Sequence, residues 1–386
     1  MTPDAPPPSP FPGPRPFRHD ESHLFFGREH QSSDIVKRLE QTRFVAVVGN
    51  AGCGKTSLVQ AGVRPMLEGG FMASAGSFWR VAVLHPGTDG VVSLAIALAD
   101  PAVLGGASEH AEERRRLLEA VLRRSSRGLI EVFQQARLEP NENLLVIVDD
   151  FEELFRAPQK APAGKPADDG AAFVSLLLEA ARSREAPIYT VVILRPERLG
   201  DCALFQSLPE MLSDGLYLVP RMTRDQRRAA IEGPLKVAGQ AITPRLMQRL
   251  LNEVGNGVDA LQKLQGALRG AWDNWSRNHA PGEAVDLRHL ETVGAVADAA
   301  SRVIPPVTAI AKLRRWPWFL AGAVASVAVT LPIVSWLRPP CPVCPAPAPN
   351  ESTMPPSLVP APLAPEPTTP APAPAPAPAP TPTPTP

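Results

Sequence analysis

The chain has 386 residues, with 39 basic and 39 acidic side chains and four cysteines. Zero formal net charge argues against a protein built mainly to neutralise nucleic-acid phosphates, and four cysteines in so long a chain exclude a disulfide scaffold. Eight of the 47 prolines lie in residues 3–16 and 21 lie in residues 339–386. The middle of the chain therefore has the composition of a globular protein, whereas the two ends do not.

The first residues have neither a basic start nor an apolar run, so they do not form a secretory signal. The run from Arg43 to Val48 is apolar and rich in valine, and it predicts a short strand. It leads directly into Gly49-Asn-Ala-Gly-Cys-Gly-Lys-Thr56, which fits the pattern G-x-x-x-x-G-K-[ST]. We expect a helix from Ser57 to Val63 to follow, stopped by Pro65. This strand, loop and helix predict a phosphate-binding loop.

The chemistry of phosphate binding predicts a role for each residue of the loop. Glycines let backbone N–H groups turn toward phosphate oxygens, and the helix presents its positive end to them. Lys55 would reach the β- and γ-phosphates, where it acts in binding and in catalysis, and the Thr56 hydroxyl would bind Mg²⁺. The residues expected to bind nucleotide here are Gly49, Asn50, Ala51, Gly52, Cys53, Gly54, Lys55, Thr56 and Ser57.

A strand is predicted at Trp79–Leu84, and a fully buried one at Leu144–Val148. Acidic residues follow the second strand, where ligands bind in parallel sheets. Asp149 is the predicted Mg²⁺ ligand. One of Asp150, Glu152 and Glu153 would orient the attacking water, and the pattern leaves open which one.

A helical segment from about residue 170 to 184 leads to the strand Ile188–Leu194, which ends at Arg195. An arginine at this level can contact a γ-phosphate and stabilise the charge of a transition state. The alternative is a solvated loop arginine. Strands alternate with helices from residue 35 to 220, which predicts an α/β fold in which a parallel sheet lies between helical layers.

Only helices are predicted after residue 220. Thr223-x-x-Gln226 is a capping box that opens one helix. Thr243-Pro244 opens another, and Gly255 ends it. Its apolar residues on one face are Leu246, Met247, Leu250, Leu251 and Val254. Further helices at 258–277 and 287–303 complete an all-α lid beside the α/β domain.

Residues 316–337 are uncharged and mostly apolar, with tryptophans at both ends of the run. At 1.5 Å per residue they reach about 33 Å, enough for one transmembrane helix. Three basic residues precede the run and one follows it closely, which places the N-terminal side in the cytoplasm. Residues 338–386 are then a disordered extracytoplasmic tail rich in Pro, Ala and Thr.

Several linked motifs resemble the novel STAND NTPase family, a branch of the AAA+-like signalling ATPases. The resemblance covers about residues 10–303. It is carried by the start Pro10-Phe-Pro-Gly-Pro-Arg-Pro-Phe17, by Leu24-Phe-Phe-Gly-Arg-Glu29, by the Walker A loop and by Val83-Leu-His-Pro-Gly87. The Walker B stretch Asp149–Phe155, Leu194-Arg195, Ile231-Glu-Gly-Pro234 and residues 287–300 complete it.

The resemblance implies roles that the residues alone do not show. Gly27, Arg28 and Glu29 would border the adenine pocket, and Arg195 would be the sensor arginine. Gly233 and Pro234 would lie near the nucleotide base from the lid side. Family members usually work as switches, closed with ADP and open or oligomeric with ATP, and they turn over slowly. Asp150 stands where the family commonly has Gln.

The expected organisation has six parts: a Pro-rich arm (1–20), a P-loop NTPase domain (21–220), a helical lid (221–303), a basic linker (304–315), the span (316–337) and the tail (338–386). The leading hypothesis is a membrane-anchored ATP/ADP switch or assembly platform in signalling, in a bacterial inner or plasma membrane. It would form a homo-oligomer with ATP and act on a protein effector. The alternatives are a non-catalytic nucleotide-binding scaffold and an envelope or secretion-associated ATPase.

Overall fold

The computed structural model of the protein describes residues 7–104, 110–155, 169–253, 255, 257, 259–280 and 282–291. The chain divides into two units, Met1–Trp316 and Pro317–Pro386, and every described residue belongs to the first. The predicted span and tail, and the helix predicted beyond residue 291, lie outside the described residues. Within the described ranges, no helix combines the length and the apolar character that crossing a bilayer requires.

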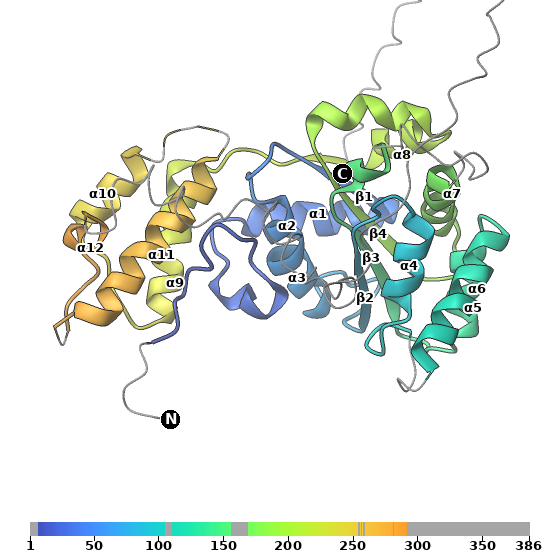
Figure 1. The fold of residues 1–386 in the computed structure, drawn as a ribbon, viewed down its shortest axis with the longest axis horizontal. Helices are drawn as coiled ribbons and strands as arrows, with labels where there is room; N and C mark the ends of the chain where they lie inside the picture. Colours follow the sequence, from blue (N-terminus) through green and yellow to red (C-terminus); the bar gives the residue numbers. More distant parts are fainter. Residues whose placement is uncertain are drawn as a thin grey trace, which may run out of the picture. The chain divides into compact units, whose positions relative to one another are not determined.

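Five parallel strands form a sheet in the order β2-β3-β4-β1-β5. The labels β1 to β4 mark it in Figure 1. Their bounds are β1 (Phe44–Val48), β2 (Trp79–Leu84), β3 (Asn143–Val148), β4 (Ile188–Leu194) and β5 (Leu216–Leu218). The four strands predicted from apolar runs are confirmed, and β5 is a short addition at the edge. The α/β class with a parallel sheet is therefore confirmed.

Side chains of the central strands alternate between two hydrophobic cores, as the two-residue period of a strand requires. In β1, for example, Ala46 and Val48 face one core, and Val45 and Val47 face the other. Figure 1 shows helices on both sides of the sheet. Those around the first core are α4 (Gly90–Leu98), α5 (Ala111–Arg124), α6 (Gly128–Gln135), α7 (Asp169–Arg182) and α8 (Leu208–Gly215). The second core lies under α1 (Glu29–Thr42), η2 (Leu58–Val63) and α3 (Arg64–Glu68).

The helix after the phosphate-binding loop differs from its prediction. It begins as α2 (Lys55–Ser57), widens into the π-helical turns of η2, and continues as α3 to Glu68. Pro65 was expected to stop it, and this was wrong. A proline is tolerated in the first turn of a helix, where its missing N–H costs no hydrogen bond. The π turns place Pro65 at that position of α3.

The lid consists of α9 (Arg224–Val237), α10 (Pro244–Glu253), α11 (Ala260–Asn278) and α12 (Leu287–Glu291). The capping box is confirmed, because the Gln226 N–H donates to Thr223 Oγ1 at 3.2 Å and the Thr223 N–H donates to Gln226 Oε1 at 2.9 Å. The start of α10 at Pro244 is confirmed as well. The helices pack around a core of their own that contains Leu250, Trp272 and Trp275.

Phe11 belongs to the lid core although it lies far from the lid helices in sequence. Its side chain is 1% exposed and packs in the cluster that includes Leu250 and Trp272. The chain then passes through η1 (His19–Leu24), whose neighbours include η2 and α9, before it enters α1. The Pro-rich start of the chain thus contacts both the lid and the helix after the phosphate-binding loop.

Candidate nucleotide-binding cleft

The strand order brings three predicted site segments to one edge of the sheet. β4 lies between β1 and β3, and the register pairs Val48 with Leu194 and Val148 with Val192. The phosphate-binding loop after β1, the acids after β3 and Arg195 after β4 therefore leave the sheet side by side. Ligands of parallel sheets bind outside these carboxyl ends.

The phosphate-binding loop turns through glycines in the left-handed region. Gly52 has φ 71° and Gly54 has φ 88°, and α2 begins directly after Gly54. The Lys55 ammonium donates to the carbonyl of Gly49 at 2.7 Å and to that of Asn50 at 3.1 Å. The lysine thus lies over its own loop, next to the N–H groups that the loop offers to an anion.

A hydroxyl and a carboxylate meet beside this loop. Thr56 Oγ1 donates to Asp149 Oδ2 at 2.9 Å, and the Asp150 N–H donates to Asp149 Oδ1 at 3.0 Å. Asp149 is 7% exposed, and burial, more than any other cause, raises the pKa of its carboxyl above the ordinary value. Two oxygens in this arrangement suit Mg²⁺, which is bound in proteins by one or two side-chain oxygens together with substrate phosphates.

Within the described ranges, no group of three or more His, Cys, Asp or Glu residues could hold a metal ion without such phosphates. The Thr56–Asp149 pair is therefore the place where the described residues fit Mg²⁺. A divalent cation there would offset the cost of burying the Asp149 charge.

The three acids predicted as alternatives for orienting the attacking water, Asp150, Glu152 and Glu153, have different surroundings. Asp150 lines the cleft, its side chain is 52% exposed, and its Oδ2 lies 3.8 Å from His85 Nδ1. Asp150 also adopts φ 50°, which turns the backbone sharply at the end of β3. This conformation is uncommon for a residue other than glycine.

The other two acids point elsewhere. Glu152 is 4% exposed, and its Oε1 accepts from Arg195 Nε at 3.0 Å. Its Oε2 has no hydrogen-bond partner among the described residues. Glu153 Oε2 accepts the Gly87 N–H at 3.2 Å. Of the three acids, Asp150 is the one that lines the cleft.

These groups surround a cavity of about 300 Å³, at the lower end of the range for ligand sites. The α/β side contributes Ala51, Gly52, Cys53, Gly54, Lys55, Thr56, Ser57, Asp149, Asp150 and Arg195. The linker and lid contribute Met222, Ala230, Leu261, Gln262, Leu264 and Gln265. The N-terminal part of the chain contributes Gly13, Pro14, Arg15, Pro16, Phe17, Phe25, Phe26 and Arg28. The cavity is therefore enclosed by three parts of the chain.

Among the residues assigned by resemblance, Arg28 has the most informative position. It lines the cleft although it is 4% exposed, and burial lowers the pKa of its guanidinium below the ordinary value. It donates to the Pro220 carbonyl at 2.7 Å and to the Cys53 carbonyl at 3.4 Å. Arg28 thus connects the phosphate-binding loop with the linker to the lid.

Gly233 contacts the cleft through another residue. A Cβ at this position would lie 2.3 Å from Cγ of Phe26, whose ring lines the cleft. Pro234 is buried inside α9. Gly233 therefore leaves room for an aromatic wall of the cleft, and neither residue borders the cavity itself.

The remaining predicted residues lie near the cleft but do not line it. Gly49 and Asn50 form the start of the loop, and Asn50 borders a smaller neighbouring cavity. Gly27 donates its N–H to Glu29 Oε1 at 2.8 Å, and neither residue lines the cleft. Sequence reasoning gave no site role to Pro14–Phe17, Phe25, Phe26, Met222 or the α11 side chains. The only sequence feature that pointed to residues 14–17 was their place in the stretch PFPGPRPF, residues 10–17.

Replacing Gly233 with alanine tests the aromatic wall. The added methyl group must displace the Phe26 ring, so we expect the free energy of unfolding to fall by about 1–3 kcal/mol and nucleotide affinity to fall with it. Denaturant unfolding and nucleotide titration measure the two effects. Gly200→Ala is the control, because a Cβ there meets nothing within 4 Å and should change stability by less than about 0.5 kcal/mol. Wild-type stability and affinity in Gly233→Ala would contradict the packing.

Replacing Asp149 with asparagine tests its burial. A carboxyl whose pKa is raised on folding lowers stability wherever the unfolded group is ionised. In protein free of nucleotide and Mg²⁺, we expect Asp149→Asn to be more stable than wild type at neutral pH. The difference should vanish as the pH falls through the raised pKa toward the ordinary value of 3.8. Unfolding curves at a series of pH values provide the measurement, and an asparagine variant that is less stable at neutral pH would refute the argument.

Comparison with known proteins identifies the family. A model described as Novel STAND NTPase 1 matches residues 10–307. No curated protein matches the sequence. Among solved structures, the ORC2 protein of Aeropyrum pernix in its ADPNP-ADP complexes is similar at 14% identity and a TM-score of 0.49, covering 72% of this chain and 69% of that chain. A chain of the E. coli MS115-1 HORMA:CdnC:Trip13 complex is similar at 14% identity and a TM-score of 0.46, with 76% and 94% covered.

A Walker-type ATPase of Pyrococcus abyssi is also similar, at 15% identity and a TM-score of 0.42, with 75% and 79% of the two chains covered. The family match is the stronger finding, since it extends over the sheet, the cleft and the lid helices. On this match the chain belongs to the novel STAND NTPase 1 family of P-loop nucleoside triphosphatases.

Proposed function

We propose that the chain is a membrane-anchored switch that binds ATP with Mg²⁺ in the cleft, hydrolyses it slowly and changes the position of its lid in response. One observation carries the proposal: the phosphate-binding loop, the Thr56–Asp149 pair, Arg195 and the lid all border the same cavity. A nucleotide bound there would contact the α/β domain and the lid at the same time.

The charges that line the cleft suit a polyphosphate. The cations are Arg15, Arg28, Lys55 and Arg195, and the carboxylates are Asp149 and Asp150. Lys55 would exchange its two carbonyl partners for phosphate oxygens, and Ala51–Thr56 would offer backbone N–H groups. Mg²⁺, when bound, supplies further neutralisation of phosphate charge. The aromatic side chains of Phe25 and Phe26 provide an apolar wall suited to a base.

Asp150 is the base in this proposal, because it alone of the three candidate acids lines the cleft. A water molecule held by its carboxylate attacks the γ-phosphorus, the bond from that phosphorus to the bridging oxygen breaks, and ADP leaves with the electron pair. The proton of the water passes to Asp150. Arg195 would stabilise the developing charge, and its ion pair with Glu152 holds its guanidinium at the end of β4.

The proposal extends to assembly and location. We propose that the ATP-bound chain forms a homo-oligomer and acts on a protein effector, with the NTPase domain in the cytoplasm of a bacterial cell. The support for the membrane anchor is the apolar run 316–337, with basic residues ahead of it. The support for a switch is that α9 and α11 of the lid share the cleft with the phosphate-binding loop.

Lys55→Ala tests nucleotide binding. Removing a charged partner of the phosphates costs about 1.5–3 kcal/mol, so we expect the affinity for ATP with Mg²⁺ to fall about 10- to 100-fold. Titration of the full-length protein with a fluorescent ATP analogue measures this. Lys236→Ala is the control, since Lys236 is an exposed lid residue that lies outside the cleft. Equal affinity in Lys55→Ala and wild type would refute the binding site.

Asp150→Asn tests the base. We expect turnover to fall about 10²- to 10⁴-fold while ATP affinity changes little, because the amide keeps the size of the side chain but cannot accept the proton. Glu153→Gln should retain most of the turnover, since Glu153 holds the Gly87 N–H. Single-turnover phosphate release measures both variants. Normal release by Asp150→Asn would remove Asp150 from this role, and binding without any release by wild type would select the non-catalytic scaffold.

A further inference from the structure

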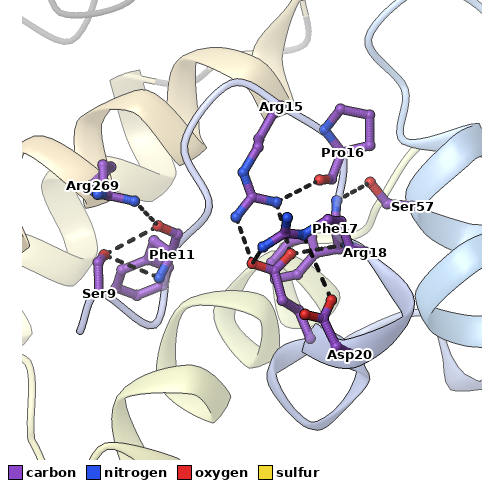
Figure 2. A network of polar contacts seen from close by, with 10 residues as sticks. Ser9, Phe11, Arg15, Pro16, Phe17, Arg18, Asp20, Ser57 and Arg269 are labelled. Atoms are coloured by element: carbon purple, nitrogen blue, oxygen red, sulfur yellow. Dashed lines mark hydrogen bonds and ion pairs between the residues drawn. The ribbon is translucent and has the colours of Figure 1, made fainter.

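The first described residues of the chain run between the lid and the phosphate-binding loop. Figure 2 shows this segment passing from the contact of Phe11 with Arg269 to the contact of Phe17 with Ser57. We refer to residues 7–17 as the strap.

The lid end of the strap is held by burial and by hydrogen bonds. The Phe11 ring lies in the lid core, and its carbonyl accepts from Arg269 Nη1 at 3.2 Å. Trp272 Nε1 donates to the Pro7 carbonyl at 3.4 Å. The Ser9 hydroxyl accepts the Phe11 N–H at 3.2 Å and donates to the Phe11 carbonyl at 3.1 Å. These two hydrogen bonds shape the local turn. Burying a phenylalanine contributes about 1.5–3 kcal/mol, so this end is firmly attached.

The other end of the strap contacts Ser57, the residue after Thr56. The Phe17 N–H donates to Ser57 Oγ at 3.1 Å, and the Phe17 ring packs edge-on against Phe25 with centroids 5.5 Å apart. A hydroxyl that accepts one hydrogen bond still has its own proton to donate. Ser57 lines the cleft, so this hydroxyl has a proton left to donate to a ligand bound there.

The middle of the strap is stiff and braced. Pro14 and Pro16 have fixed φ angles, and both line the cleft. Arg15 donates to Glu21 through Nη1 at 2.7 Å and through Nη2 at 2.5 Å, and the Arg18 N–H donates to the same carboxylate at 2.9 Å. The Arg15 guanidinium, as the largest cause, lowers the pKa of Glu21 to about 2, so the brace stays ionised at physiological pH.

We propose that the strap is a second connection between the lid and the α/β domain that controls nucleotide release, with Phe11 and Phe17 as its positioning residues. The first connection is the linker between β5 and α9, which contributes Met222 to the cleft. The cavity therefore lies between two connections, and the lid can move away from the phosphate-binding loop only as far as both allow. This inference rests on the proposed binding of nucleotide in the cleft.

The experiment lengthens the strap between its two anchors. Inserting Gly-Ser-Gly between Pro14 and Arg15 adds about 10 Å of reach while Phe11 and Phe17 stay in place. We expect the full-length variant to release a fluorescent ADP analogue at least fivefold faster than wild type in stopped-flow displacement. Its unfolding midpoint should match that of the control, which carries the same insertion after Gly239, an exposed position between α9 and α10 that lies outside the cleft.

A substitution provides an independent readout. Phe11→Ala removes the lid anchor, whereas Leu250→Ala removes a comparably buried side chain of the same core that does not belong to the strap. Both lower stability, but we expect only Phe11→Ala to speed ADP release, and Phe11→Leu to restore most of the wild-type rate. Single-turnover phosphate release at saturating ATP should change less than twofold in Phe11→Ala, since Phe11 lies outside the cleft, and this separates positioning from catalysis.

The outcomes separate the two proposals. If wild type binds ADP, and the strap insertion releases it at the wild-type rate or no faster than the Gly239 control, the strap inference is wrong and the nucleotide site stands. Equal acceleration in Phe11→Ala and Leu250→Ala would also overturn the strap, because lid stability alone would then set the rate. If wild type shows no saturable ADP binding, the proposed function fails and the strap fails with it.

Discussion

Burial of one carboxylate at the end of a central strand constrains the whole cleft. Asp149 follows β3, which is covered on both faces, so its charge lies where water cannot reach it freely. Thr56 and the Asp150 N–H offset part of that cost. Because Thr56 lies in the first turn of the helix after the phosphate-binding loop, the same hydrogen bond ties the two nucleotide motifs together. The position of β4 between β1 and β3 then places Arg195 between them.

The cleft is built from three parts of the chain, and each supplies a different kind of group. The α/β domain supplies charges and backbone N–H groups, the lid supplies mostly apolar and amide side chains, and the N-terminal part supplies aromatic rings and two arginines. Arg28 connects these parts by donating to the carbonyls of Cys53 and Pro220, and the strap does so through the Phe17 N–H, which donates to the Ser57 hydroxyl. Short, direct contacts therefore link the phosphate-binding loop to the linker that leads to the lid.

Local patterns predicted much of this fold. Apolar runs located four strands, because a strand buried on both faces needs apolar residues throughout. The capping box at Thr223 and the proline at position 244 located two helix starts, since both act within one turn. The prediction that Pro65 stops a helix failed because the π-helical turns of η2 place Pro65 in the first turn of α3, where a proline is tolerated. The formation of π turns depends on packing rather than on the local sequence.

The candidate site was predictable where its chemistry lies in one segment. The loop 49–57 is such a segment, and most of it lines the cleft. The choice among three acids within four residues was not predictable, because it depends on the backbone turn at Asp150 and because only Asp150 of the three lines the cleft. Likewise, Gly233 acts through Phe26, a contact between residues more than 200 positions apart. Such long-range contacts have no signature in the sequence of either residue.

The attachment of Phe11 to the lid has a consequence for biosynthesis. Its carbonyl bonds Arg269, 258 residues further along the chain. At about 5–20 residues per second, the ribosome needs roughly 10 to 50 seconds to deliver that partner. Throughout this interval the Phe11 side chain of the nascent protein remains without its final packing. The Pro-rich composition around it resists helix and strand formation, which keeps the waiting segment from pairing prematurely with a neighbouring chain.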